Sequence, residues 1–308
     1  MIFKTPTQGS SERGIALIAV LWVCALVSVL AAGFTYILRT ETQLNIALHD
    51  RARAGVGAEA GIQRVLAMLT SAPPGSDSRL PLQQYTLRYD DMDLEIKLAS
   101  EAGKIDLNAA PAAIIKGLLQ HASSVLENLD SEQATALADA IMDWRDADSR
   151  PRDKGAERRA YLAQGLAGPR DQPFLSVTEL RQVIGMSRQV FEFLSPLVSV
   201  NSQSARIDPR AASRDTLLAI PGLDAELVDT YLTSREQGDE GSARLALLRS
   251  SKSLLVPPRV RAYTIISQAR TLSGVRALRR AVVRLNRKAG SPIVFMDWSQ
   301  FSQGTVVN

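Results

Sequence analysis

The chain has 308 residues, 45% hydrophobic and 22% charged, a balance typical of globular proteins with room for two domains. Its net charge of +4 is small for this length and gives no nucleic-acid-binding footprint. The single cysteine, Cys24, excludes an intrachain disulfide. The two histidines, His49 and His121, are far apart and have no cysteine partner, which argues against a zinc site.

The first predicted element is an uncharged apolar run, Ile15–Leu38. As a helix it spans about 36 Å, enough to cross a bilayer. Lys4 and Arg13 precede the run, whereas Arg39 and Glu41 follow it. Because the leader is basic and the far flank is mixed, the sequence favours a cytoplasmic N-terminus and a periplasmic body.

The apolar run continues into a longer helix. A secretory signal peptide would instead have an apolar region of about 7–15 residues ending in a small-residue cleavage site. Here helical spacing of apolar residues persists beyond Leu38 until Pro73-Pro74-Gly75 ends it. Gly55, Gly57 and Gly61 weaken the helix by about 1 kcal/mol each relative to alanine, which predicts a bend in its middle.

Two segments after this helix and three near the C-terminus alternate apolar and polar residues, which predicts β-strands. The first two form a hairpin around residues 90–93. We expect both groups to build one antiparallel sheet, with Arg276, Arg279 and Arg284 on its exposed face. The predicted strands lie in residues 85–89, 94–98, 262–267, 275–285 and 293–296.

The region between the two strand groups, about 104–250, is predicted to be mostly helical and contains a weak internal repeat. Lys104–Pro111 and Arg206–Ser213 share an Ile-Asp pair followed by a helix start. We expect Asn108 and Ser213 to cap the helices that follow.

The repeat resembles helix-hairpin-helix modules, which bind DNA phosphate with backbone N–H groups of a glycine hairpin. The hairpins here are Gly185-Met186-Ser187 and Gly222-Leu223-Asp224, and neither has the second glycine. Asp224 and Glu226 would also repel phosphate. We therefore expect the fold of such a module without nucleic-acid binding.

Three acidic residues, Asp146, Asp148 and Glu157, are the best cation-site candidate. Two carboxylates at alternate loop positions and a third from a later residue suit a flexible oxygen cage, and calcium is the natural ion in the periplasm. Arg150–Arg152 occupy positions where an EF-hand needs ligands and a glycine, which excludes that motif. The alternative is an acidic helix end paired with Arg158-Arg159.

Catalytic patterns are absent from the sequence: no serine nucleophile elbow, zinc-protease motif or phosphate-binding loop is present. We therefore do not expect an enzyme, although a membrane-tethered periplasmic enzyme stays open as an alternative.

The N-terminus carries a family resemblance. Arg13-Gly14 before Ile15 resembles the junction at which prepilin peptidases cut type IV pilins and pseudopilins. The resemblance implies a leader of residues 1–14, cleavage between Gly14 and Ile15, and methylation of Ile15. Most such subunits have glutamate five residues into the mature chain, where this sequence has Ala19. In this departure from the usual pattern, the sequence resembles the K-type pseudopilins.

The helical region is also similar to the insert of K-type minor pseudopilins of type II secretion systems (the GspK family). The resemblance implies an α+β pseudopilin fold: a long N-terminal transmembrane helix, an antiparallel β-sheet, and a large all-α insert with helix-hairpin-helix, SAM-like repeats. It also implies calcium in the insert. The matching stretches are Gly103–Pro111, Ile141–Asp148, Gly155–Glu157 with Tyr161, and Ser176–Arg181.

The resulting domain organisation has five parts. They are a leader at 1–14, a transmembrane segment at 15–38, the first part of the pseudopilin domain at 39–103, the insert at 104–250, and C-terminal strands at 251–308. The resemblance implies a subunit of the bacterial inner membrane that caps the pseudopilus tip and promotes its assembly for export of folded proteins across the outer membrane. The implied partners are other minor pseudopilins (I and J types), the major pseudopilin filament and the prepilin peptidase, with no nucleic acid.

A tip position follows from two features. In pilin-like filaments, the glutamate that most subunits have at this position resembles a counter-charge for the terminal amine of a neighbouring subunit. Ala19 cannot supply that charge. An insert of nearly 150 residues would also be hard to repeat at every step of a filament.

The first alternative function is a minor pilin of a type IV pilus or DNA-uptake machine.

Overall fold

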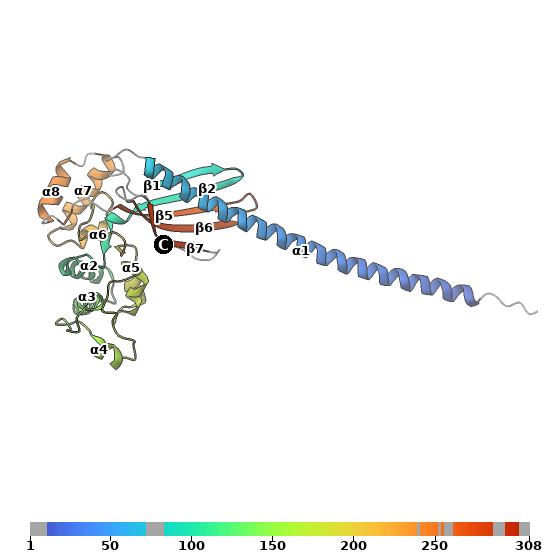
Figure 1. The fold of residues 1–308 in the computed structure, drawn as a ribbon, viewed down its shortest axis with the longest axis horizontal. Helices are drawn as coiled ribbons and strands as arrows, with labels where there is room; N and C mark the ends of the chain where they lie inside the picture. The colour runs from blue at the N-terminus through green and yellow to red at the C-terminus, as the bar shows by residue number, and fades with distance from the viewer. Residues whose placement is uncertain are drawn as a thin grey trace, which may run out of the picture.

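The computed structural model describes residues 11–71, 83–238, 241–251, 254–255, 261–285 and 293–301. A long N-terminal helix lies along a five-stranded sheet, and a group of short helices hangs from the far end of that sheet (Figure 1). This arrangement confirms the α+β fold with a long N-terminal helix and antiparallel sheet. Most of the leader (1–10) and of the linker expected at 71–83 falls outside the described residues.

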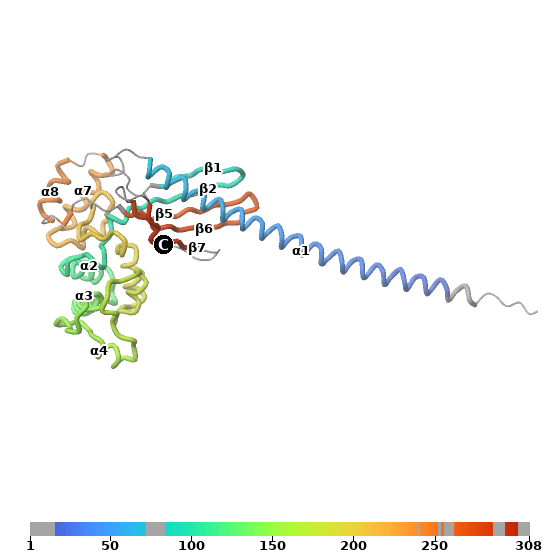
Figure 2. Tube along the Cα trace, in the orientation of Figure 1, coloured from blue at the N-terminus to red at the C-terminus, as the bar shows by residue number. Residues whose placement is uncertain are grey.

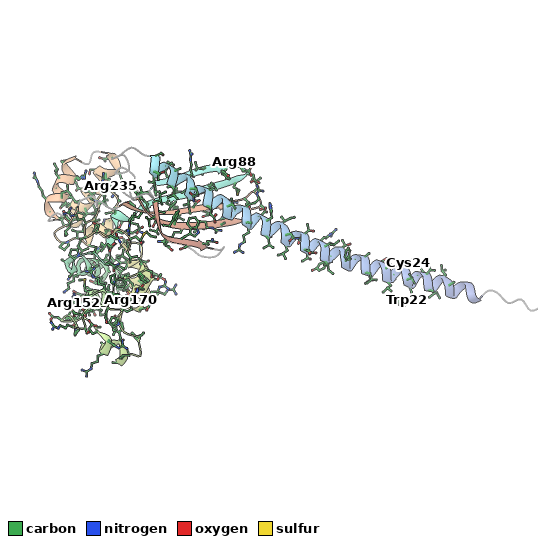
Figure 3. All side chains as sticks on the ribbon, in the orientation of Figure 1. Trp22, Cys24, Arg88, Arg152, Arg170 and Arg235 are labelled. Atoms are coloured by element: carbon green, nitrogen blue, oxygen red, sulfur yellow. The ribbon has the colours of Figure 1, made fainter. Side chains whose placement is uncertain are left out.

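Helix α1 runs without interruption from Ser11 to Ser71. Its N-terminal half extends away from the rest of the molecule, and Trp22 and Cys24 project from it on the bare part (Figure 3). Trp22 is 73% exposed. α1 is the one helix of the described chain that is long and apolar enough to cross a membrane. Its most apolar 18-residue stretch has a mean hydropathy of 2.6 and is not buried at all.

The sheet has the strand order β1-β2-β5-β6-β7, with every neighbouring pair antiparallel. The expected hairpin and the three C-terminal strands are therefore confirmed, and the two ends of the chain do build one sheet. β2 lies beside β5 although the whole helical segment separates them in sequence (Figure 2). The strands are β1 (Gln83–Tyr89), β2 (Met92–Ser100), β5 (Arg261–Arg270), β6 (Arg276–Leu285) and β7 (Ile293–Phe301).

The C-terminal half of α1 packs on β2, β5 and β6 around one buried apolar cluster. The three glycines of this half belong to the contact face. A Cβ on Gly61 would lie 2.2 Å from the Ser267 hydroxyl oxygen, and one on Gly57 would lie 3.0 Å from the Met92 side chain. The glycines therefore let the helix backbone approach the sheet closely, and α1 stays continuous through them. From α1 the cluster contains Ala58, Ile62, Val65, Leu66 and Leu69.

The expected exposed stripe of three arginines is wrong at Arg279. Residues of β6 alternate between the two faces of the sheet, so Arg279 points to the opposite face from Arg276 and Arg284. It lies under α1 with 14% of its side chain exposed, and its Nε is 3.4 Å from Glu59. Arg280 lies on the same face as Arg276 and Arg284, and it pairs with Asp297 of β7 at 2.9 Å.

The segment between β2 and β5 contains its own buried apolar cluster, separate from the one under α1. It is mostly helical, as expected, and the boundaries of 104 and 250 stay predictions. Its elements are η2 (Glu101–Gly103), β3 (Ile105–Asp106), α2 (Ala112–Val125), α3 (Ser131–Arg145), α4 (Arg158–Ala163), η3 (Val177–Gln182), α5 (Arg188–Leu194), β4 (Val198–Ser199), α6 (Arg214–Leu218), α7 (Ala225–Gln237) and α8 (Gly241–Ser250).

The internal repeat is visible in the backbone pairing. β3 pairs in parallel with β4, and Ile207 of the second copy forms a parallel bridge with Leu255. The aspartate that follows each isoleucine is buried, and its Oδ1 accepts a hydrogen bond from the backbone N–H two residues on: Asp106 at 2.9 Å and Asp208 at 3.1 Å. Each copy therefore opens with the same buried turn.

Each opening turn is also held by an arginine from a later helix, which the sequence did not indicate. Arg145, at the end of α3, donates to the carbonyls of Leu107 and Ala110 in the first copy. Arg235, near the end of α7, donates to the carbonyls of Pro209, Arg210 and Ala212 in the second. The two copies thus share a long-range contact as well as local sequence.

One of the two expected helix caps is confirmed. The Ser213 hydroxyl accepts from the Thr216 N–H at the start of α6, as a capping serine should. The expectation for Asn108 is wrong, because α2 begins after Pro111 without a side-chain cap. Asn108 instead makes two hydrogen bonds with the backbone of Phe174, at 2.9 and 2.7 Å.

Glu101 occupies the junction between sheet and helical segment and is only 2% exposed. Its carboxylate accepts from Thr264 of β5 at 2.8 Å, from Ser199 of β4 at 2.5 Å and from Lys104 at 2.8 Å. Burial acts to raise the Glu101 pKa, but Lys104 and the two hydroxyls outweigh it, so that the pKa is lowered below its ordinary value.

We expect Glu101→Gln to reduce the free energy of unfolding at pH 7 by about 2–4 kcal/mol, because it removes the acceptor charge and leaves Lys104 unpaired. A carboxyl whose pKa is lowered on folding stabilises the fold above its unfolded pKa, and this stabilisation is lost as pH falls through the folded pKa. The difference between wild type and variant should therefore shrink in acid. Urea unfolding at several pH values measures it, and a difference that is independent of pH would contradict the role of the charge.

Candidate functional site

The processing junction expected from the sequence lies in the first turns of α1. The helix begins at Ser11, so the backbone at Arg13, Gly14 and Ile15 is helical. Ala19 follows on the exposed, uncharged part of α1. Cleavage after Gly14 and methylation of Ile15 stay predictions.

The three acidic candidates come together at the outer end of the helical segment. Asp146 is the residue immediately after α3, Asp148 lies in the loop that follows, and Glu157 stands immediately before α4. One carboxylate oxygen from each lies within 4.8 Å of the others. The loop folds back because Gly155 packs on Asp143, where a Cβ would clash with the carboxylate.

Several oxygens of this cluster are buried without a hydrogen-bond partner. They are Asp146 Oδ1, both carboxylate oxygens of Glu157, and Asp171 Oδ1. Glu157 is 8% exposed. Burial, followed by the charges of Asp171, Asp143 and Asp146, raises the pKa of Glu157, while the Arg158 N–H acts weakly in the opposite sense. An unpaired buried carboxylate among other carboxylates is costly, so this donor set fits a hard cation such as calcium.

The arginine that pairs with the cluster is not one of those expected. Within the described chain no ion pair joins Arg158 or Arg159 to the three acidic residues. Arg152 instead donates from Nη1 to the buried carboxylate of Asp143 and to Asp146 Oδ2. Asp143, with its side chain fully buried, also accepts from the Arg152 backbone N–H at 3.2 Å.

Sequence reasoning missed Asp143, Arg152 and Asp171 as members of the cluster. Asp143 lies one helical turn before Asp146–Ala147, a spacing that places it on the same side of α3 and that was available as a signal. Asp171 is 14 residues after Glu157 and has a positive φ of 54°. No local pattern marks it, because a loop of irregular backbone brings it back to the site.

The two glycine hairpins do not leave helix N-termini open to phosphate. Gly222 has a φ of +90°, and the Asp224 side chain caps α7 by accepting from the Leu227 N–H at 2.8 Å. In the other hairpin, Ser187 caps α5 by accepting from the Val190 N–H at 3.2 Å. Each N-terminus is thus occupied by its own side chain, with a carboxylate in the first case.

His121 connects the two copies of the repeat. Its Nε2 lies 2.8 Å from Asp215 Oδ1 of α6, and its ring packs against Phe193 at 5.9 Å between centroids. No serine hydroxyl of the described residues is hydrogen-bonded to this ring. The arrangement is that of a structural contact between α2 and α6.

Comparisons with known proteins agree on one family. The family model described as type II secretion system (T2SS), protein K matches residues 97–203. A putative type II secretion system protein K of Escherichia coli K12 is 27% identical over 213 residues, which are 63% of this chain and 64% of that protein. Type II secretion system protein K of Klebsiella pneumoniae is 30% identical over 204 residues, 61% of this chain and 62% of that protein. The match thus spans just under two thirds of both relatives.

The fold is similar to a solved structure as well. A chain in the crystal structure of the GspK-GspI-GspJ complex from the enterotoxigenic E. coli type 2 secretion system superposes with a TM-score of 0.58 at 14% identity, covering 86% of this chain and 99% of that one. The chain is therefore similar in sequence to type II secretion system protein K, and it shares the fold of a chain in the GspK-GspI-GspJ complex.

Proposed function

We propose that the chain is a minor pseudopilin that caps the tip of the type II secretion pseudopilus and promotes its assembly. The observation that carries the proposal is α1: its C-terminal half is fixed on the sheet, while its N-terminal half is bare, apolar and long enough to cross a bilayer. Such a helix can leave the inner membrane and pack among the helices of neighbouring subunits, with the rest of the chain in the periplasm.

The tip position is supported by Ala19 and by the helical segment. Ala19 offers no carboxylate to a neighbour's terminal amine, and an unpaired charge inside an apolar helix bundle is unfavourable. The helical segment hangs from the end of the sheet remote from the membrane part of α1 (Figure 1). A single copy at the end of a filament has space for this bulk. The partners that we propose are I-type and J-type minor pseudopilins and the major pseudopilin filament.

We further propose that Asp146, Asp148 and Glu157 hold a calcium ion, with Asp171 facing the same site. The unpaired buried oxygens of Asp146 and Glu157 support this assignment. The ion would supply the positive charge that Glu157 lacks and would fix the loop between α3 and α4.

The alternatives receive less support. A minor pilin of a DNA-uptake machine would need open phosphate sites, and the hairpin before α7 carries Asp224 at its helix start. A tethered enzyme would need a catalytic constellation, and the ring of His121 is engaged by Asp215 in a contact between helices.

The function is tested by coexpression with the I-type, J-type and major pseudopilins. We expect a stoichiometric complex after membrane extraction, and labelled protein at one end of assembled filaments. Ala19→Glu should impair tip-specific placement, because the added carboxylate can pair within the stack. Label along the whole filament, or unchanged assembly and secretion for both Ala19→Glu and a deletion of the helical segment, would leave the tip position unsupported.

Processing is tested by the mature N-terminus. In cells with prepilin peptidase, N-terminal sequencing and mass spectrometry of the membrane-extracted protein should find a methylated Ile15 as the first residue. Gly14→Val should retain the leader, because the peptidase cuts after glycine in the family that this junction resembles. A start at Met1 or near Phe34 in the wild-type protein would show that the junction is not used.

Calcium binding is tested by thermal melting with calcium and with chelator. Calcium at a hundredfold excess over Kd should stabilise the protein by about 2.7 kcal/mol. Glu157→Gln should remove this response. In chelator the variant should be at least as stable as wild type, because it removes a buried charge whose pKa is raised.

Glu127→Gln, at an exposed position, is the matched control and should keep the full calcium response. Wild type should therefore be the more stable protein with calcium, whereas Glu157→Gln should be at least as stable as wild type with chelator. Identical wild-type melts with calcium and chelator would remove the metal assignment and leave the fold unaffected.

A further inference from the structure

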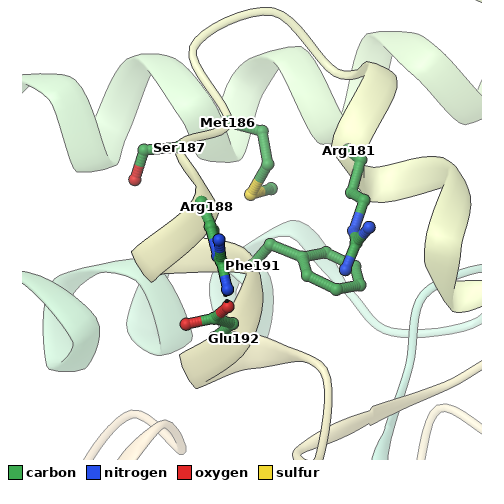
Figure 4. Close-up of a pocket in the computed structure, with 6 residues that line it drawn as sticks. All are labelled: Arg181, Met186, Ser187, Arg188, Phe191 and Glu192. Carbon is green, nitrogen blue, oxygen red and sulfur yellow. Dashed lines mark hydrogen bonds and ion pairs between the residues drawn. The ribbon is translucent and has the colours of Figure 1, made fainter. Parts of the chain in front are cut away.

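A hollow of about 500 Å³ opens where η3 meets α5, at the first glycine hairpin, and none of the roles above uses it. Two arginines border it, and an aromatic ring and a thioether form its floor (Figure 4). The residues that line it are Arg181, Met186, Ser187, Arg188, Phe191 and Glu192.

The guanidinium of Arg181 is held in place but carries no acidic partner. Its Cζ lies 4.2 Å from the centre of the Phe191 ring, and Phe191 is itself buried. Within the described chain, no ion pair involves Arg181. The nearest acid in sequence, Glu179, is engaged by Arg170 at 3.2 Å and by the Leu175 N–H at 3.0 Å. Stacking on the ring orients the guanidinium and leaves its edge N–H groups free to donate.

The second arginine is already neutralised. Arg188 Nε lies 2.7 Å from Glu192 Oε1, so the hollow offers one unpaired positive charge above an apolar floor. A single planar guanidinium matches one carboxylate, through two parallel N–H···O hydrogen bonds. A nucleic-acid backbone needs several cations in a row, and Glu192 would oppose a second phosphate. The Met186 side chain and the Phe191 ring would contact an apolar side chain that stands next to the acidic residue in the ligand.

The place of the hollow in the fold indicates where the ligand comes from. α5 lies on the side of the helical segment that is turned towards the N-terminal end of α1 (Figure 1). A second subunit packed alongside α1 would occupy the space next to this side.

We propose that the hollow binds an acidic side chain, flanked by an apolar one, of the neighbouring pseudopilin subunit, with Arg181 as the carboxylate receptor. The proposal rests on the function proposed above and adds the surface and the chemistry of the contact. It is specific to the hairpin before α5, because the hairpin before α7 presents Asp224 instead.

The test uses the full-length chain coexpressed with the minor pseudopilins, followed by purification in a nonionic detergent. Arg181→Gln should reduce the amount of copurified neighbour at least fivefold. Arg159→Gln, at another exposed arginine of the same helical segment, should leave it unchanged. Because Arg181 is exposed and loses only its stacking on Phe191, the melting temperature of Arg181→Gln should stay close to that of wild type, so that lost copurification cannot be attributed to unfolding.

Two further measurements identify the ligand. A photo-crosslinking amino acid at position 188 should capture a partner peptide that contains Asp or Glu beside an apolar residue. In fluorescence anisotropy, a labelled peptide of alternating Glu and Leu should bind wild type at least tenfold more tightly than Arg181→Gln, and a Lys-Leu peptide should not bind.

Three outcomes would overturn the proposal: equal copurification by wild type and Arg181→Gln, a crosslinked peptide without an acidic residue, or tighter binding of a labelled single-stranded oligonucleotide than of the acidic peptide. Each of these leaves the proposed function in place if wild type copurifies with its partners. Failure of wild type itself to copurify would overturn the proposed function together with this contact.

Discussion

The buried carboxylate of Glu101 is the point at which the parts of this molecule are joined. It receives hydrogen bonds from the sheet through Thr264 and from the helical segment through Ser199. The next residue, Ala102, connects this junction to the second copy of the repeat, because its carbonyl accepts a hydrogen bond from the Asp208 N–H at 2.8 Å. Next to them a Cβ on Gly103 would lie 2.2 Å from the Ala211 carbonyl oxygen, so only glycine allows this approach. Three residues in a row thus hold the sheet and both copies together.

The elements with strong periodicity were predictable from the sequence. The uncharged run and the period-2 strands place α1 and all five strands of the sheet, because burial of one face fixes the pattern. The error at Arg279 came from neglecting that alternation: residues 276 and 279 differ by an odd number and must face opposite ways in a regular strand. The helical spacing of apolar residues in the C-terminal half of α1 also places its glycines on the face that packs on the sheet, where they set how closely the helix approaches the strands.

Contacts between distant residues could not be predicted. Asn108 is a good capping residue by type, but Phe174 offers both of its backbone groups, and this pairing across 66 residues prevails. Arg145 and Arg235 hold equivalent turns at different sequence distances, so a repeat search based on fixed spacing does not align them. In the acidic cluster, chemistry indicated Asp146, Asp148 and Glu157, whereas the contribution of Asp171 depends on a loop whose course only the structure shows.

The adjacency of β2 and β5 has a consequence for the order of folding. The whole helical segment is topologically the loop of a single antiparallel hairpin, and the Thr264–Glu101 contact that closes it spans 163 residues. Closing so long a flexible loop costs about 4–5 kcal/mol of chain entropy, several times the cost of a short turn. If the helices collapse first through their local contacts, the ends of the segment are brought near each other and this cost falls. A chain that emerges from a membrane with its N-terminus anchored would then complete its sheet last, after the bulk of its polypeptide is already compact.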